Sequence, residues 1–93
     1  MKNIRFPGFC MFPGYRWCGP GCSGPGDPIN KVDQACKEHD ECYSLHSNSS
    51  RCECDIDFMR KLDAYRNPHT EEGRRASAMY HYMRVQSFFR CRF

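Results

Sequence analysis

The sequence has no long apolar run. Its longest candidate near the start, residues 9–12, is interrupted by Pro13. A membrane-spanning helix needs about 20 mostly apolar residues, so we expect no transmembrane segment. A signal peptide needs a shorter apolar stretch after a basic start. None follows residues 1–5, so we expect no signal peptide in this chain.

Internal repeats, low-complexity linkers and convincing strand patterns are also missing. Their absence argues against a repeat array, a multidomain chain with flexible connections, and a β-sheet fold. With 93 residues, the chain is predicted to form a single domain over residues 1–93. A domain of this size buries only a modest share of its surface, so core packing alone gives marginal stability.

Cysteine, in contrast, is abundant, because the chain has eight. An even number at this density in a short chain is typical of a disulfide framework formed in an oxidising compartment. Four bridges would stabilise the domain by about 2–4 kcal/mol each. We therefore expect a secreted or extracellular protein. The net charge of +3 fits an anionic surface without requiring one, and we expect a monomer with no nucleic-acid partner.

Helix signals follow a segment rich in turn-forming residues. Residues 5–28 contain five of the six prolines and six of the seven glycines, which excludes a long regular element there. Asn30 resembles a helix N-cap, with Asp33 three residues later. We predict an all-α fold with helices at about 31–43, 52–65 and 71–89. The residues expected on buried helix faces are Ile56, Met59, Leu62, Ala76, Met79, Tyr80 and Met83.

The glycine-rich loop and the first predicted helix together favour a cation site. Residues three and four apart share a helix face, so Cys36 lies one turn before Asp40. A Cys18–Cys36 bridge would pin the loop beside this carboxylate. Gly19 and Gly21 permit backbone shapes that other residues avoid, so the loop can turn several carbonyl oxygens toward one point. Calcium prefers oxygen ligands of this kind.

A histidine and an aspartate can pair across two of the predicted helices. Cys42 lies one turn after His39, and Cys54 directly precedes Asp55. A Cys42–Cys54 bridge would bring the pair together. Asp55 would then fix the tautomer of His39 and leave the other ring nitrogen as a general base. With no nucleophilic side chain beside it, such a pair most naturally activates water, and a nearby calcium ion would stabilise the developing oxyanion.

Four separated blocks, in this order, resemble the secreted phospholipase A2 family. The blocks are Cys18-Gly19-Pro20-Gly21, Pro28-x-x-x-x-Asp33, Cys36-x-x-His39-Asp40-x-Cys42-Tyr43 and Cys52-Glu53-Cys54-Asp55. The resemblance covers residues 17–55. It implies calcium-dependent hydrolysis of the sn-2 acyl ester of glycerophospholipids at a membrane or micelle surface, with a calcium loop at 16–28.

The resemblance also implies a role for each site residue. His39 is the implied base, Asp55 its partner, and Tyr43 a hydrogen-bond donor to Asp55. The implied ligands of Ca²⁺ are Asp40 and the main-chain carbonyls of Trp17, Gly19 and Gly21, and the amide of Gly19 is the implied oxyanion donor.

This chain departs from the family pattern in three ways. Asn30 stands where members commonly have an aspartate at the helix start, and it caps as well. Ala35 and Lys61 stand where members usually have a cysteine pair, and the joint loss of both halves indicates a coherent variant. The usual N-terminal amphipathic helix and the β-hairpin between the helices are also missing. The form is similar to the compact microbial members.

Two alternatives are weighed against the hydrolase. The first is a catalytically silent module with the same fold that binds a membrane or a protein, although this chain keeps both His39 and Asp40. The second is a zinc site. Cys18-x-x-x-Cys22 fits a ligand pair, but Cys52-x-Cys54 has the wrong spacing for the common zinc fingers.

The disulfides and the aromatic residues complete the predictions. Helix-face spacing favours Cys18–Cys36 and Cys42–Cys54, and elimination leaves Cys10–Cys22 and Cys52–Cys91. The aromatic residues permit a core or a lipid-facing interpretation, because basic residues surround them. We favour the core for Phe89, and the surface for part of the N-terminal group Phe6, Phe9, Phe12 and Trp17.

Overall fold

The computed structural model describes residues 10–19, 21–46 and 50–91, except for the side chain of Arg90. Within these ranges it contains three α-helices and no strand: α1 (Lys31–Leu45), α2 (Arg51–Tyr65) and α3 (Glu71–Cys91). The all-α prediction is confirmed, and each helix begins and ends within two residues of its expected bounds. That residues 1–93 form a single domain stays a prediction.

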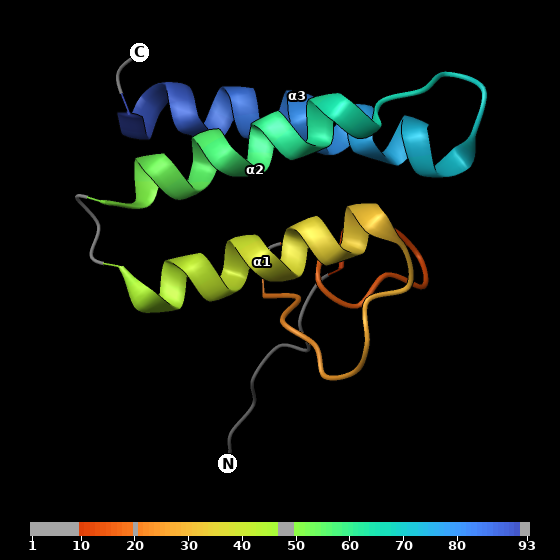
Figure 1. The fold of residues 1–93 in the computed structure, drawn as a ribbon, viewed down its shortest axis with the longest axis horizontal. Coiled ribbons are helices and arrows are strands. Elements are labelled where there is room, and N and C mark those ends of the chain that lie inside the picture. The colour runs from red at the N-terminus through yellow and green to blue at the C-terminus, as the bar shows by residue number, and fades with distance from the viewer. Residues whose placement is uncertain (1–9, 20, 47–49, 92–93) are drawn as a thin grey trace.

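Each helix runs antiparallel to the one before it, and α2 packs against both of the others (Figure 1). The irregular segment that precedes α1 lies along the N-terminal half of that helix (Figure 1). No helix in the described part of the chain has both the length and the apolar character needed to cross a bilayer. In this arrangement α1 has three neighbours, namely α2, α3 and the glycine-rich segment that precedes it.

Side chains that precede α1 and α3 satisfy the free amides at the helix starts. The side-chain oxygen of Asn30 accepts a hydrogen bond from the Asp33 amide at 2.9 Å, which confirms the predicted N-cap. Thr70 Oγ1 likewise accepts from the Gly73 amide at 3.0 Å.

The core lies where the helices meet. Five residues predicted to face it are buried, namely Met59, Leu62, Ala76, Met79 and Met83, and Tyr80 is partly buried. The prediction for Ile56 is wrong, because its side chain is 37% exposed. On α2 the face that meets the other helices is filled by Phe58 and Leu62, which are buried almost completely, and Ile56 projects from a different side.

The aromatic residues differ from the expected division at Phe89. Phe89 is 75% exposed, so its placement in the core is wrong. Phe12 is buried at 4% exposure and forms an edge-to-face contact with Tyr15, whereas Trp17 is half-buried. Phe12 and Tyr15 belong to the buried core, and Trp17 packs against it. Phe89 instead lies on an outer face of α3 whose large apolar side chains are exposed. Phe6 and Phe9 lie outside the described residues.

All four predicted disulfides are confirmed. Two of them secure the loop, one joins α1 to α2, and one joins α2 to α3: Cys10–Cys22, Cys18–Cys36, Cys42–Cys54 and Cys52–Cys91. Where the family pattern has a further bridge, α1 and α2 are linked by an ion pair instead. Lys61 Nζ lies 2.7 Å from a carboxylate oxygen of Glu38, one turn after Ala35.

Candidate active site

A buried carboxylate shapes the glycine-rich loop. Asp33, in the first turn of α1, is fully buried. Its two oxygens accept hydrogen bonds from the amides of Trp17 at 2.8 Å, Arg16 at 3.2 Å and Ile29 at 3.1 Å. These bonds compensate the burial of the carboxylate. They also tie the two ends of the loop to the start of α1. The sequence places Asp33 at the helix start and in one of the family-like blocks, but it predicts no contact between this side chain and the loop.

Covalent and conformational features hold the same loop close to α1. Cys18 is bonded to Cys36, which lies one turn before Asp40. Gly19 has a φ of 127° and Gly21 a φ of 76°, a region that residues with a Cβ rarely adopt. The backbone conformation at these two positions therefore favours glycine, as predicted.

A cavity of about 260 Å³ opens between the loop, α1 and α3. Its polar wall comes from the loop and from α1, and its apolar wall comes from α2 and α3. The lining residues are Trp17, Gly19, Gly21, Ser23, Cys36, His39, Asp40, Tyr43, Phe58, Met79, Tyr82, Met83 and Gln86. A cavity with one apolar side and a few convergent polar groups is the usual form of a small-molecule site.

His39, which lines this cavity, forms a close pair with the buried Asp55. The Nε2 atom of His39 lies 2.7 Å from Oδ1 of Asp55. The aspartate is fully buried, whereas the histidine side chain is 12% exposed. Because Nε2 faces the carboxylate, the imidazole is set to donate from Nε2, and Nδ1 is the nitrogen left to take up a proton.

Two hydroxyl groups hold Asp55 from different helices. Tyr43 of α1 donates to Oδ1 at 2.6 Å, which places this residue as the resemblance implied. Ser87 of α3 donates to Oδ2 at 3.2 Å and is itself fully buried. The contribution of Ser87 was not expected from the sequence, because no spacing connects it with a residue 32 positions earlier.

The ring of His39 is also fixed by packing. Phe58 stacks on it with ring centroids 4.3 Å apart and planes 18° apart, and Tyr43 lies against it at 4.4 Å. An imidazole held by one hydrogen bond and two ring contacts keeps one orientation toward the cavity. Phe58 was not among the predicted site residues.

Asp40 fits a ligand of a hard cation. It lines the cavity with Trp17, Gly19 and Gly21, so the four predicted calcium ligands come together. Burial raises the pKa of the Asp40 carboxyl to about 6, although the charge of His39 and the hydroxyl of Ser23 oppose the shift. A half-buried carboxylate in a cavity that the glycine-rich loop also lines is compatible with the oxygen ligands that Ca²⁺ favours.

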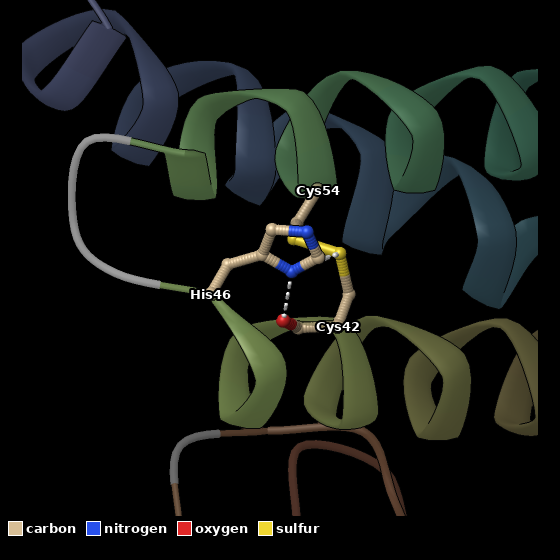
Figure 2. A group of neighbouring side chains, drawn as sticks. All are labelled: Cys42, His46 and Cys54. Atoms are coloured by element: carbon tan, nitrogen blue, oxygen red, sulfur yellow. Dashed lines mark hydrogen bonds between the residues drawn. A yellow bond between two sulfur atoms is a disulfide. The ribbon is translucent and has the colours of Figure 1, made fainter.

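A second group has metal-binding side chains but cannot serve as a thiolate site. Figure 2 shows Cys42, His46 and Cys54, whose potential ligand atoms lie within 4.8 Å of one another. Cys42 and Cys54 are joined in a disulfide, and only the thiolate form of cysteine ligates metal. His46 Nδ1 is instead 2.9 Å from the carbonyl oxygen of Cys42. All eight cysteines are in disulfides, so the zinc interpretation has no thiolate to use.

Comparison with known proteins agrees with this geometry. The model of the phospholipase A2-like domain family matches residues 9–71. The acidic phospholipase A2 homolog taipoxin gamma chain of Oxyuranus scutellatus scutellatus is 50% identical over 36 residues, which cover 39% of this chain and 22% of that protein. Capsid protein VP1 of Galleria mellonella densovirus is 56% identical over 51 residues, which cover 53% of this chain and 6% of VP1.

Capsid protein VP1 of feline panleukopenia virus is 48% identical over 40 residues, which cover 42% of this chain and 6% of that protein. The chain thus spans less than a quarter of each of these relatives. No solved structure matches it. The family match nevertheless takes in the glycine-rich loop, α1 and α2. The chain belongs to the family of phospholipase A2-like domains.

Proposed function

We propose that the protein is a calcium-dependent phospholipase A2 that hydrolyses the sn-2 acyl ester of glycerophospholipids. The observation that carries the proposal is the His39–Asp55 pair at 2.7 Å, in a cavity that Asp40 and the glycine-rich loop also line. In this proposal a general base and a cation site share one cavity, so that water is activated and the developing oxyanion is stabilised at the same ester.

In this proposal His39 is the base. Nδ1 takes a proton from the attacking water while Nε2 donates to Asp55, whose negative charge stabilises the imidazolium that forms. Tyr43 and Ser87 hold the carboxylate in place. The proton can then pass from His39 to the departing alcohol oxygen, so the histidine ends the cycle neutral.

The loop and Asp40 would hold the cation. The carboxylate of Asp40 and the carbonyls of Trp17, Gly19 and Gly21 are the proposed ligands. Bound calcium would neutralise phosphate charge and polarise the ester carbonyl. In this proposal the amide of Gly19, in the same loop, would donate to the oxyanion.

The apolar side of the cavity suits an acyl chain. Phe58, Met79 and Met83 are buried core residues that also line it. An acyl chain laid against them would leave water, which is favourable in proportion to the apolar area covered. The proposed partner is therefore a phospholipid surface or micelle.

The alternative is a silent binding module. One matched relative is called a phospholipase A2 homolog, and capsid proteins are matched as well. The presence of His39, Asp40 and Asp55 in one arrangement favours hydrolysis. The four disulfides favour an extracellular setting.

Fatty-acid release from phospholipid vesicles tests the proposal. We expect release with calcium and none with a chelator. His39→Gln should abolish release and retain calcium binding, whereas His69→Gln, at an exposed histidine outside the cavity, should change neither. Calcium and lipid binding without release by the unmodified protein would support the silent module instead.

A further inference from the structure

We propose that the outer C-terminal face of α3 docks the protein on an anionic phospholipid membrane. We call this face the α3 apolar strip and define it as Val85, Phe88 and Phe89. The inference rests on the proposed function and names the surface through which that site would reach its substrate.

The strip is the most exposed cluster of large apolar side chains in the described structure. Val85 and Phe88 are each 59% exposed and Phe89 is 75% exposed. The two rings touch edge to face, with centroids 5.4 Å apart. Together with Arg84, the strip lines a hollow in the surface. Clustered apolar groups of this kind mark an interaction surface, whereas single exposed ones do not.

Part of the strip lies next to the proposed catalytic cavity. Tyr82 and Gln86 of α3 line that cavity. Val85 comes three residues after Tyr82, and Phe89 comes three residues after Gln86. Residues at this spacing are neighbours on a helix surface, so Val85 and Phe89 lie next to the cavity-lining side of α3. Phe88 comes two residues after Gln86 and therefore faces away from the cavity. A membrane that contacts Val85 and Phe89 would therefore lie beside the cavity.

The charge around the strip selects the class of partner. From residue 73 to residue 93 the sequence contains five arginines and no aspartate or glutamate. Among the described side chains, Arg84 is exposed beside the strip, whereas Arg74 and Arg75 lie near the opposite end of α3. Aromatic side chains with surrounding cations suit the boundary between headgroups and acyl chains, and each nearby cation is attracted to anionic lipid. A membrane fits both features, because it offers negative charge and an apolar layer together.

The test uses vesicles of diether phospholipids, which have no ester to hydrolyse. The unmodified protein should co-sediment with phosphatidylcholine vesicles that contain phosphatidylserine, and more weakly with phosphatidylcholine alone. Phe88→Ser with Phe89→Ser should weaken vesicle binding by about tenfold or more, because two exposed rings lose their apolar contact. Leu45→Ser is the matched control, since Leu45 is 78% exposed on α1, and it should leave binding unchanged.

A second assay separates this proposal from the proposed function. The double variant should hydrolyse a short-chain phospholipid dissolved as monomers at the unmodified rate, because neither ring lines the catalytic cavity. Unchanged vesicle binding by the double variant would overturn the docking proposal. So would a dimer that the double variant converts to a monomer, or binding of an RNA homopolymer in place of vesicles. If the unmodified protein does not hydrolyse the monomeric substrate, the proposed phospholipase activity is wrong. The vesicle-binding result would still decide the docking proposal by itself.

Discussion

Ser87 Oγ donates a hydrogen bond to Oδ2 of Asp55 at 3.2 Å, from α3 to α2, and both side chains are fully buried. The bond lies close to a covalent link between the same helices. Cys91 follows Ser87 by four residues, Cys52 precedes Asp55 by three, and these cysteines are bonded to each other. The orientation of the proposed catalytic aspartate thus depends on α3 as well as on α1.

Replacing Ser87 should show how much this bond contributes. Ser87→Ala leaves one buried carboxylate oxygen without this donor, at a cost of about 1–3 kcal/mol in the free energy of unfolding. We expect kcat to fall and KM to stay nearly constant, because Ser87 does not line the cavity. Denaturant unfolding and hydrolysis kinetics measure the two effects. Ser87→Thr, which keeps the hydroxyl, should restore kcat, and equal losses in both variants would indicate a packing role only.

The His39–Asp55 pair predicts a graded pattern. His39→Gln should lower hydrolysis by about 10²–10⁴-fold or more, because general-base catalysis is lost. Asp55→Asn should cost less, since the imidazole remains stacked on Phe58 and loses only its charged acceptor. Titration of released fatty acid compares the variants. A larger loss for Asp55→Asn than for His39→Gln would contradict the assigned roles.

Replacing Asp40 should weaken calcium binding while leaving the proposed base, His39, in place. Asp40→Asn replaces the one charged ligand in the proposed set with a neutral one, so we expect both calcium affinity and hydrolysis to fall. Calorimetry with calcium measures the first effect. Glu41→Gln, at the adjacent exposed carboxylate, is the control and should retain both. Full calcium affinity in Asp40→Asn would remove Asp40 from the ligand set.

Calcium binding should depend on pH through the same carboxyl group. The pKa of Asp40 is raised to about 6 by burial, so without calcium the group is mostly protonated below pH 6 and mostly ionised above it. Calcium binds the ionised form. Affinity should therefore fall as pH drops through 6, and binding near pH 6 should release protons. Calorimetry in buffers with different ionisation enthalpies measures this release. His39→Gln should keep the proton release but move the fall in affinity to higher pH, because the charge of His39 no longer lowers the pKa of Asp40. The absence of proton release in the unmodified protein would contradict this prediction.

Asp33 predicts a structural effect that reaches the calcium loop. Asp33→Asn places an N–H group where amides of Arg16, Trp17 or Ile29 now donate. We expect the free energy of unfolding to fall by about 1–3 kcal/mol and calcium affinity to fall with it. Asp57→Asn is the control, because Asp57 is 55% exposed. Equal unfolding curves for the two variants would contradict the role of Asp33.

The parts of the fold that the sequence predicts are those set by local spacing. Helix periodicity and the cap at Asn30 place α1, and cysteine positions on helix faces place the bridges that bring His39 to Asp55. The hydrogen bond from Ser87 to Asp55 could not be predicted, because the two residues lie on different helices and serine has no distinctive sequence pattern. Phe89 was wrongly predicted to lie in the core, because helix periodicity shows only which residues share a helix face. It does not show which face is covered when rings such as Phe12 have already filled the core.

The two disulfides on α1 have a consequence for where activity can arise. Cys36 and Cys42 lie three residues to either side of His39, and each ties α1 to another part of the site. Thiols stay reduced in a cytosol, and a chain of this size has little core to hold the loop and α2 in place without bridges. We therefore expect the newly made chain to be harmless to the membranes of the cell that makes it, and to gain its assembled site only on reaching an oxidising compartment.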